Sequence, residues 1–203
     1  HRRFLVELHR RTRPQLRQRC CSKPGPPPLC KSRPVPQRKA ELADWREGLT
    51  SGFLAPTDFQ KEVIDLVDKY QIPLDLMTAI IDGCEMDTEP LRFRTWEELQ
   101  GYTWKVACAV GLISLKLFGA TDPKSETFAV ALGHALQLTN IMRDIGEDAA
   151  NNGRIYLPLD DLEKFSYSEE DLLNRTYDAR FTALMQFEFE RCHQLYETAR
   201  TSL

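Results

Sequence analysis

Helical spacing of apolar residues runs from Lys39 to the end of the chain, and no stretch shows the strict alternation typical of a β-strand. When all apolar residues recur at helical spacing, each helix has one apolar stripe, and these stripes can be buried only by packing helices against one another. The sequence therefore predicts an all-α fold with helices of ordinary length. The expected helices cover residues 41–53, 59–70, 74–87, 97–118, 123–148 and 177–200, with a shorter one after residue 168.

Helix start and stop signals support these limits. Threonine or serine three residues before a polar partner predicts an N-cap or capping box, and proline favours a first turn. Gly119 is expected to end one helix, and Gly153 follows two asparagines that break the long one. The start signals are Thr57, Pro73, Thr95 with Glu98, Asp122 with Pro123, and Ser168 with Asp171.

Charge divides the chain into two parts. Residues 1–39 hold twelve arginines and lysines against the single acid Glu7, together with seven of the twelve prolines. We interpret residues 1–38 as a disordered or non-native basic segment and residues 39–203 as one helical domain. A basic arm for an anionic membrane or nucleic acid is the alternative for the segment. The acidic remainder argues against nucleic acid as a partner and suits a site that gathers divalent metal.

Cysteine usage and hydropathy indicate the compartment. The six cysteines show neither zinc-site spacing nor a disulfide framework, which favours a reducing cytoplasm. No apolar run approaches the roughly 18 residues that cross a bilayer, and the N-terminus lacks the apolar core of a secretory signal.

The stretch QLTNIMRDIGED, residues 137–148, places four polar side chains on one stripe of an otherwise apolar helix. At about 100° per residue they fall within an arc of roughly 80°. Because carboxylates one turn apart repel each other, we expect a cation between Asp144 and Asp148. Mg²⁺ is typically held by one or two carboxylates plus substrate phosphates, so it is the expected cofactor. The polar stripe consists of Gln137, Asn140, Asp144 and Asp148.

Arg143 lies beside this stripe, and its planar guanidinium suits a phosphate oxygen. A diphosphate neutralised by Mg²⁺ is a good leaving group, which makes diphosphate ionisation the expected chemistry. An isolated pair of aspartates four apart is most often a solvated helix face, and spacing alone leaves that alternative open. The amides on the same arc favour a functional site.

The segment ALQLTNIMRDIGEDAANNGRIYLP, residues 135–158, resembles the second aspartate-rich region of the squalene and phytoene synthases. These enzymes join two prenyl diphosphates head to head. IIDGCEMD and GYTWKVACAVGLIS, residues 80–87 and 101–114, resemble the same family in the right order. Within the motif, AANN before Gly153 is one residue longer than the usual connection. The resemblance covers roughly residues 40–200 and implies an isoprenoid-synthase-like helical bundle.

The resemblance also implies roles for individual residues. Asp144 and Asp148 would bind Mg²⁺ and diphosphate, with Asn140 as a further metal ligand, and Gln137 would lie in the catalytic and substrate site. Tyr102 matches a tyrosine that faces the reacting carbons. The remaining substrate-binding residues would be Arg143 at the diphosphate, Arg154 and Tyr156 in a closing loop, and Val106, Ala107, Val110 and Gly111 in the wall of the prenyl pocket.

Structural alternatives accompany several of these residues. Tyr102 can also be a plain core tyrosine, and the small residues after it can simply pack helices together. His134 and His193 stand alone in the sequence and are interpreted as ordinary core or surface residues. The acidic residues Asp82, Glu85 and Asp87 are interpreted as structural or solvated.

The chain departs from the family pattern upstream, where the resemblance implies a first aspartate-rich helix. Residues 1–39 contain no aspartate, so we expect a domain incomplete at the N-terminus and at the C-terminus, with activity in doubt. The expected function is an Mg²⁺-dependent prenyltransferase acting on farnesyl or, less favoured, geranylgeranyl diphosphate to give presqualene diphosphate, squalene or phytoene. The alternative is a non-catalytic binding or assembly module. Apolar substrates make peripheral membrane contact compatible with a cytoplasmic protein, and the oligomeric state stays open.

Overall fold

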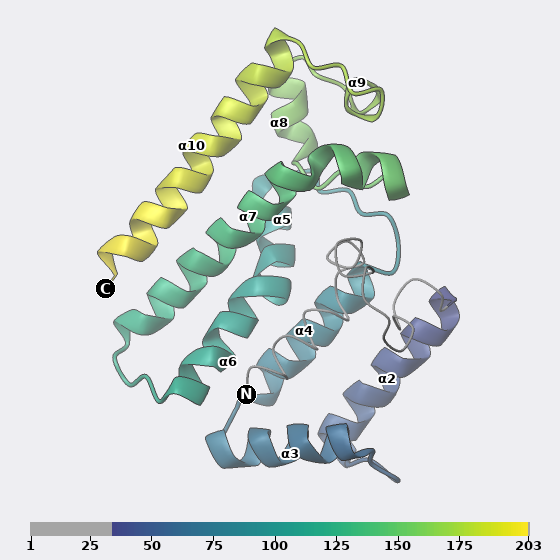
Figure 1. Cartoon of the computed structure of the whole chain (residues 1–203), viewed down its shortest axis with the longest axis vertical. Helices are drawn as coiled ribbons and strands as arrows, with labels where there is room; N and C mark the ends of the chain where they lie inside the picture. The colour runs from purple at the N-terminus through teal and green to yellow at the C-terminus, as the bar shows by residue number, and fades with distance from the viewer. Residues whose placement is uncertain (1–33, 203) are drawn as a thin grey trace, which may run out of the picture. The chain divides into compact units, whose positions relative to one another are not determined.

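The computed structural model describes residues 34–202, except for the side chains of residues 151 and 152. All regular secondary structure in this part is helical, and it contains no β-strand, which confirms the predicted all-α class. The helices belong to two compact units that meet in the sequence at Thr88 and Glu89 (Figure 1). The basic segment lies almost wholly outside the described residues, so its predicted disorder and its predicted boundary remain predictions.

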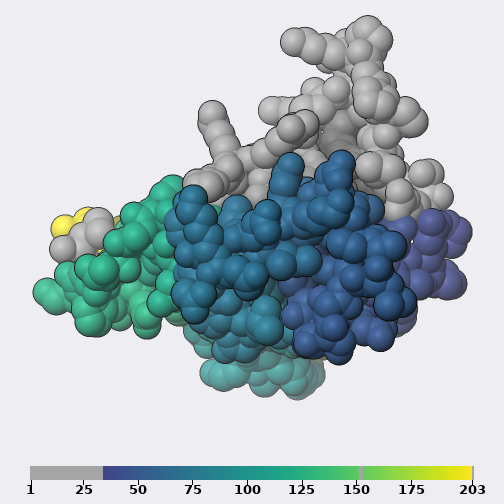
Figure 2. Space-filling view, turned by 90° about the horizontal axis from the view of Figure 1, so that it is seen from below, coloured from purple at the N-terminus to yellow at the C-terminus, as the bar shows by residue number. Residues whose placement is uncertain are grey.

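Over residues 34–88, the described part of the first unit, the chain forms three helices, coloured purple to blue in Figures 1 and 2. They are α2 (Val35–Ser51), α3 (Asp58–Tyr70) and α4 (Leu74–Met86). Thr57 caps α3 as predicted and forms a full capping box with Gln60, whereas Pro73 is the N-cap of α4 rather than part of its first turn. The capping box predicted for Thr95 and Glu98 is only half formed, because the Glu98 carboxylate accepts from the Arg94 backbone N–H instead. Helix α2 begins earlier than predicted, directly after Pro34, because proline suits the first residues of a helix.

Charged residues of α2 and α4 pair within this unit. Arg46 lies 2.7 Å from a carboxylate oxygen of Asp82 and 3.3 Å from one of Glu85. Two members of the acidic group noted in the sequence therefore have a structural partner. Both ion pairs are partly exposed, so each contributes little to the free energy of unfolding.

The second unit, as described from residue 89 to residue 202, contains six α-helices and one π-helical segment. A single helix was predicted over residues 97–118, but the chain there forms α5 (Trp96–Thr103), the π-helix η2 (Trp104–Cys108) and α6 (Ala109–Phe118). The periodic apolar pattern could not reveal this difference, since a π-helical turn adds one residue without interrupting the helix. The other helices are α7 (Lys124–Asn152), α8 (Leu159–Lys164), α9 (Glu169–Leu173) and α10 (Ala179–Thr201).

Helix α7 packs against η2 and α6 on one side and against α10 on another (Figure 1). Gly133 permits the first of these contacts, because a Cβ at this position would lie 2.8 Å from the Cα of Cys108. Gly111 approaches α7 in the same way, since a Cβ there would lie 3.2 Å from the carbonyl oxygen of Ala129. The long helix ends at Gly153, whose φ of 60° is in the left-handed region that favours glycine.

A buried ionic group joins α8 to α10. Arg191 Nη1 lies 2.7 Å from Asp161 Oδ2 and 2.8 Å from Glu188 Oε2, while its guanidinium carbon lies 4.5 Å from the ring centroid of Trp96. The side chain of Glu188 is fully buried, and burial raises the pKa of its carboxyl group to about 7. The group holds two carboxylates against one arginine, so loss of the Glu188 proton leaves a buried excess of negative charge.

Substitution of Gly133 by alanine tests the packing of α7. We expect Gly133→Ala to lower the free energy of unfolding by about 1–3 kcal/mol, because the added methyl group meets the backbone of Cys108. Gly101→Ala is the matched control, since nothing lies within 4 Å of a Cβ at Gly101 and alanine favours the helix. Urea denaturation measures both variants, and equal stability of the two would contradict the proposed close contact.

Glu188 predicts a pH dependence of stability. Its folded-state pKa of about 7 exceeds the ordinary value of 4.5, so the folded protein retains a proton that the unfolded chain releases. The free energy of unfolding should therefore fall by roughly 2–3 kcal/mol as the pH rises from about 4.5 to about 7. Glu188→Gln should lose this slope, as measured by urea denaturation across that range. Parallel curves for wild type and variant would show that Glu188 does not hold the proton.

Candidate active site

Helix α7 carries the polar stripe on a largely buried face. Asp148 is 6% exposed and Gln137 is 5% exposed. Asn140 is half-buried, and the side chain of Asp144 is 17% exposed. A solvated helix face would expose its carboxylates, so burial disfavours that reading of the aspartate pair.

Arg143 supplies a cationic partner for the stripe. Its Nε donates to Asp144 Oδ1 at 2.7 Å and its Nη2 donates to Asp144 Oδ2 at 2.6 Å. This two-pronged hydrogen bond raises the pKa of Arg143, and the negative charge of Asp148 acts in the same direction. The expected cation beside Asp144 is thus present as a side chain, so Mg²⁺ would have to compete with Arg143 for this carboxylate.

Tyr102 belongs to a buried group of three aromatic rings. Its ring centroid lies 5.4 Å from that of Phe93 and 5.5 Å from that of Tyr156. The loop that carries Arg154 and Tyr156 also contacts the end of α7, because the Arg154 backbone N–H donates to the Asp148 carbonyl at 3.2 Å. Three of the predicted site residues are thereby brought together with Asp148 within one unit.

Phe93 was not singled out in the sequence, although it stacks with both tyrosines. Its backbone carbonyl also accepts a hydrogen bond from the N–H of Leu159 at 2.9 Å. The segment before α5 is therefore tied to the segment that follows Tyr156. A lone phenylalanine outside a helical pattern gave no signal of this role.

The small residues after Tyr102 have mixed surroundings. Val106 and Ala107 lie in η2 and, like Val110, are half-buried. Gly111 lies against the backbone of α7 at Ala129, which is a packing contact. A role of these four residues in a prenyl pocket remains a prediction.

The stripe offers oxygen ligands only. Two carboxylates and the amide of Asn140 match the preference of Mg²⁺ for hard oxygen donors. Within residues 34–202 no three histidine, cysteine, aspartate or glutamate side chains converge into a metal cluster. The residues therefore fit a metal ion that takes its remaining ligands from water and substrate phosphate.

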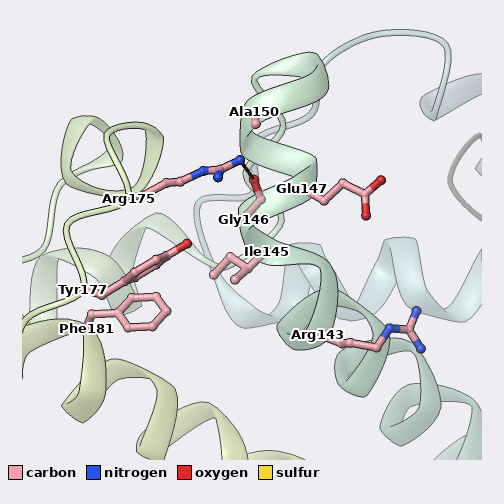
Figure 3. Close-up of a pocket in the computed structure, with 8 residues that line it drawn as sticks. All are labelled: Arg143, Ile145, Gly146, Glu147, Ala150, Arg175, Tyr177 and Phe181. Carbon is pink, nitrogen blue, oxygen red and sulfur yellow. Dashed lines mark hydrogen bonds between the residues drawn. The ribbon is translucent and has the colours of Figure 1, made fainter. Parts of the chain in front are cut away.

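A groove of about 500 Å³ lies along α7 beside Arg143 (Figure 3). Arg175 donates to the Gly146 carbonyl at 3.3 Å, and the ring centroids of Tyr177 and Phe181 are 4.9 Å apart. Arg143 points away from these residues, so the two arginines do not form a joint anion site (Figure 3). The groove was not predicted, because it depends on the loop before α10. Its lining consists of Arg143, Ile145, Gly146, Glu147, Ala150, Arg175, Tyr177 and Phe181.

Comparison with known proteins identifies this arrangement. The family profile described as squalene/phytoene synthase matches residues 30–203. The chain belongs to the squalene/phytoene synthase family. The resemblance inferred from QLTNIMRDIGED and GRIYLP is therefore confirmed.

Curated relatives carry the name phytoene synthase. The chain is 39% identical over 181 residues to phytoene synthase of Arthrospira platensis, covering 80% of this chain and 57% of the relative. It is 39% identical over 171 residues to 15-cis-phytoene synthase of Synechocystis sp., covering 77% and 50%. The chain thus spans between 50% and 57% of the length of these two family members.

Solved structures of the family share the fold. Squalene synthase from Alicyclobacillus acidocaldarius superimposes with a TM-score of 0.73 at 26% identity, covering 83% of this chain and 63% of that one. A dehydrosqualene synthase in complex with ligand gives a TM-score of 0.68 at 24% identity, covering 96% and 64%, and supports the fold alone. The predicted isoprenoid-synthase-like helical bundle is confirmed. Over the described residues, every helix is too short or too polar to cross a bilayer.

Removal of Arg143 should strengthen metal binding to the stripe. We expect Arg143→Gln to raise the affinity for Mg²⁺ about fivefold, because it releases Asp144 from a partly exposed ion pair worth roughly 1 kcal/mol. Isothermal titration with Mg²⁺ measures the change. Arg175→Gln is the control, since it removes the same charge from a side chain that bonds to Gly146 instead. Equal effects of the two variants would attribute the change to net charge and contradict the competition.

Proposed function

We propose that this family member acts in the head-to-head condensation of two prenyl diphosphates. The C–O bond of one allylic diphosphate breaks, and its carbon joins the double bond of the second substrate with loss of a proton to form a cyclopropyl product. The observation that carries the proposal is the burial of Asp148 and the near-burial of Asp144 on one stripe of α7. A buried carboxylate is costly unless its charge is compensated, and a metal ion with a diphosphate group would supply such compensation at this stripe.

The residues of the polar stripe would divide the work of binding. Asp144, Asp148 and Asn140 would hold Mg²⁺ at the diphosphate, and Gln137 would orient the substrate. The bound metal supplies charge neutralisation for the departing diphosphate. Arg143 is placed to exchange its bond with Asp144 for a bond to a phosphate oxygen, since both groups accept its two parallel donors.

The aromatic group would act on the hydrocarbon end of the substrate. Tyr102 packs against Phe93 and Tyr156, which contact each other as well, and an aromatic face stabilises a passing carbocation. The buried rings also keep water away from the reactive carbon. Arg154 and Tyr156 would close the diphosphate end of the site, and the small residues of η2 and α6 would line the path of the chain. These last residues are Val106, Ala107, Val110 and Gly111.

For the substrate we propose geranylgeranyl diphosphate, with a phytoene-type C40 product. The support is the shared name of the curated relatives in Arthrospira platensis and Synechocystis sp.. The sequence motif by itself slightly favoured the C15 substrate, farnesyl diphosphate. Both substrates therefore belong in the same assay.

Incubation of the chain with Mg²⁺ and radiolabelled geranylgeranyl or farnesyl diphosphate tests the function. We expect a product of doubled carbon number, formed faster from the C20 substrate. Asp144→Asn and Asp148→Asn should each reduce the rate at least about 100-fold, because each removes a charged metal ligand. Glu147→Gln should stay within about twofold, since this exposed carboxylate of α7 lies outside the stripe. Absence of coupled product from both substrates would contradict the proposal.

A further inference from the structure

The π-helix η2 is attached to α7 at both of its ends. At its start, Thr103 Oγ1 lies 2.7 Å from His134 Nδ1, and both side chains are buried. At its end, the backbone of Cys108 occupies the space beside Gly133 that a Cβ would take, and Cys108 Sγ donates to the Val130 carbonyl at 3.2 Å. Two consecutive residues of α7 therefore hold a segment whose own hydrogen bonds are of the less stable π type.

Thr103 also determines which nitrogen of His134 carries the proton. Thr103 Oγ1 lies 3.1 Å from the Gln100 carbonyl oxygen, which can only accept. A hydroxyl group has one hydrogen, so both contacts are hydrogen bonds only when His134 Nδ1–H donates to Thr103. Burial lowers the pKa of His134, so a neutral imidazole with its proton on Nδ1 agrees with this arrangement.

This hydrogen bond lies between the two halves of the candidate site. Thr103 follows Tyr102 directly in the sequence, and the Tyr102 ring packs at a tilt against Phe93 and stacks on Tyr156. On the other side, His134 lies one turn before Gln137, the first residue of the polar stripe. The backbone that carries Tyr102 is thus bonded to the helix that carries Asp144 and Asp148.

We propose that Thr103 and His134 are positioning residues, which hold the Tyr102 ring in register with the polar stripe of α7 through their hydrogen bond. The part of this inference that concerns catalysis rests on the proposed function. The part that concerns the position of Tyr102 does not. His134 is thereby assigned a role that its isolated place in the sequence did not suggest.

The experiment labels the full chain with 3-fluorotyrosine and follows the fluorine resonance of Tyr102, assigned by its loss in Tyr102→Phe. Thr103→Val removes the hydroxyl group at nearly constant volume and should displace the resonance by more than its linewidth. Thr103→Ser restores the hydroxyl group and should return the resonance to the wild-type position. Thr139→Val is the matched control, because Thr139 contributes a comparable contact from α7 to Tyr196 of α10, at 3.1 Å.

Two further readouts complete the test. In turnover with geranylgeranyl diphosphate, Thr103→Val should lower kcat about tenfold with KM within twofold, because misplacement of Tyr102 affects the reacting carbons more than binding. His134→Asn keeps an N–H donor near the Nδ1 position and should preserve the Tyr102 resonance, whereas His134→Leu should displace it. This second pair decides the question if Thr103→Val does not fold.

An unchanged Tyr102 resonance in folded Thr103→Val or His134→Leu would overturn the positioning role. A displaced resonance with unchanged kcat would also overturn it, because Tyr102 would then move without consequence. If wild type forms no product, the proposed function fails, while the fluorine resonances still decide whether Thr103 and His134 position Tyr102.

Discussion

The close approach of η2 to α7 is the constraint on which the second unit depends. Only a residue without a Cβ fits at Gly133, because the backbone of Cys108 occupies the space that a side chain would take. This approach places Thr103 beside His134 and so ties the aromatic group around Tyr102 to the helix with the polar stripe. A π-helical turn at this point costs hydrogen-bond quality, which agrees with the tendency of such turns to occur at functional sites.

Electrostatics explain how the stripe is stable without a ligand. The carboxylates of Asp144 and Asp148 would repel each other on this largely buried face, and the ion pair between Arg143 and Asp144 relieves that repulsion. The same arginine is suited to phosphate, so its side chain can pair either with Asp144 or with a bound diphosphate. Binding of a metal–diphosphate complex would then exchange one set of charge pairs for another rather than bury new unpaired charge.

The sequence predicted the fold class and most helix limits, because each depends on local periodicity or on capping, whereas the roles of the polar stripe residues remain predictions. Thr57 and Ser168 start their helices as expected, whereas the long helix continues through the two asparagines expected to break it and ends at Gly153. Three features could not be predicted from the sequence. The π-helix keeps the helical pattern of apolar residues, and the pairing of Thr103 with His134 joins positions 31 residues apart. The bond from Arg143 to Asp144 depends on a rotamer that no spacing encodes.

The central claim is that the carboxylates of α7 hold a metal-bound diphosphate. The most direct measurement is a crystal structure of the chain with Mn²⁺ in place of Mg²⁺ and a thiolo-diphosphate analogue of the prenyl substrate. An anomalous difference map from these crystals would locate the manganese. The account predicts a manganese peak in direct contact with Asp144 and Asp148, Arg143 turned to the phosphate, and the hydrocarbon chain against Tyr102. A metal bound elsewhere, with Asp144 still paired to Arg143, would contradict it.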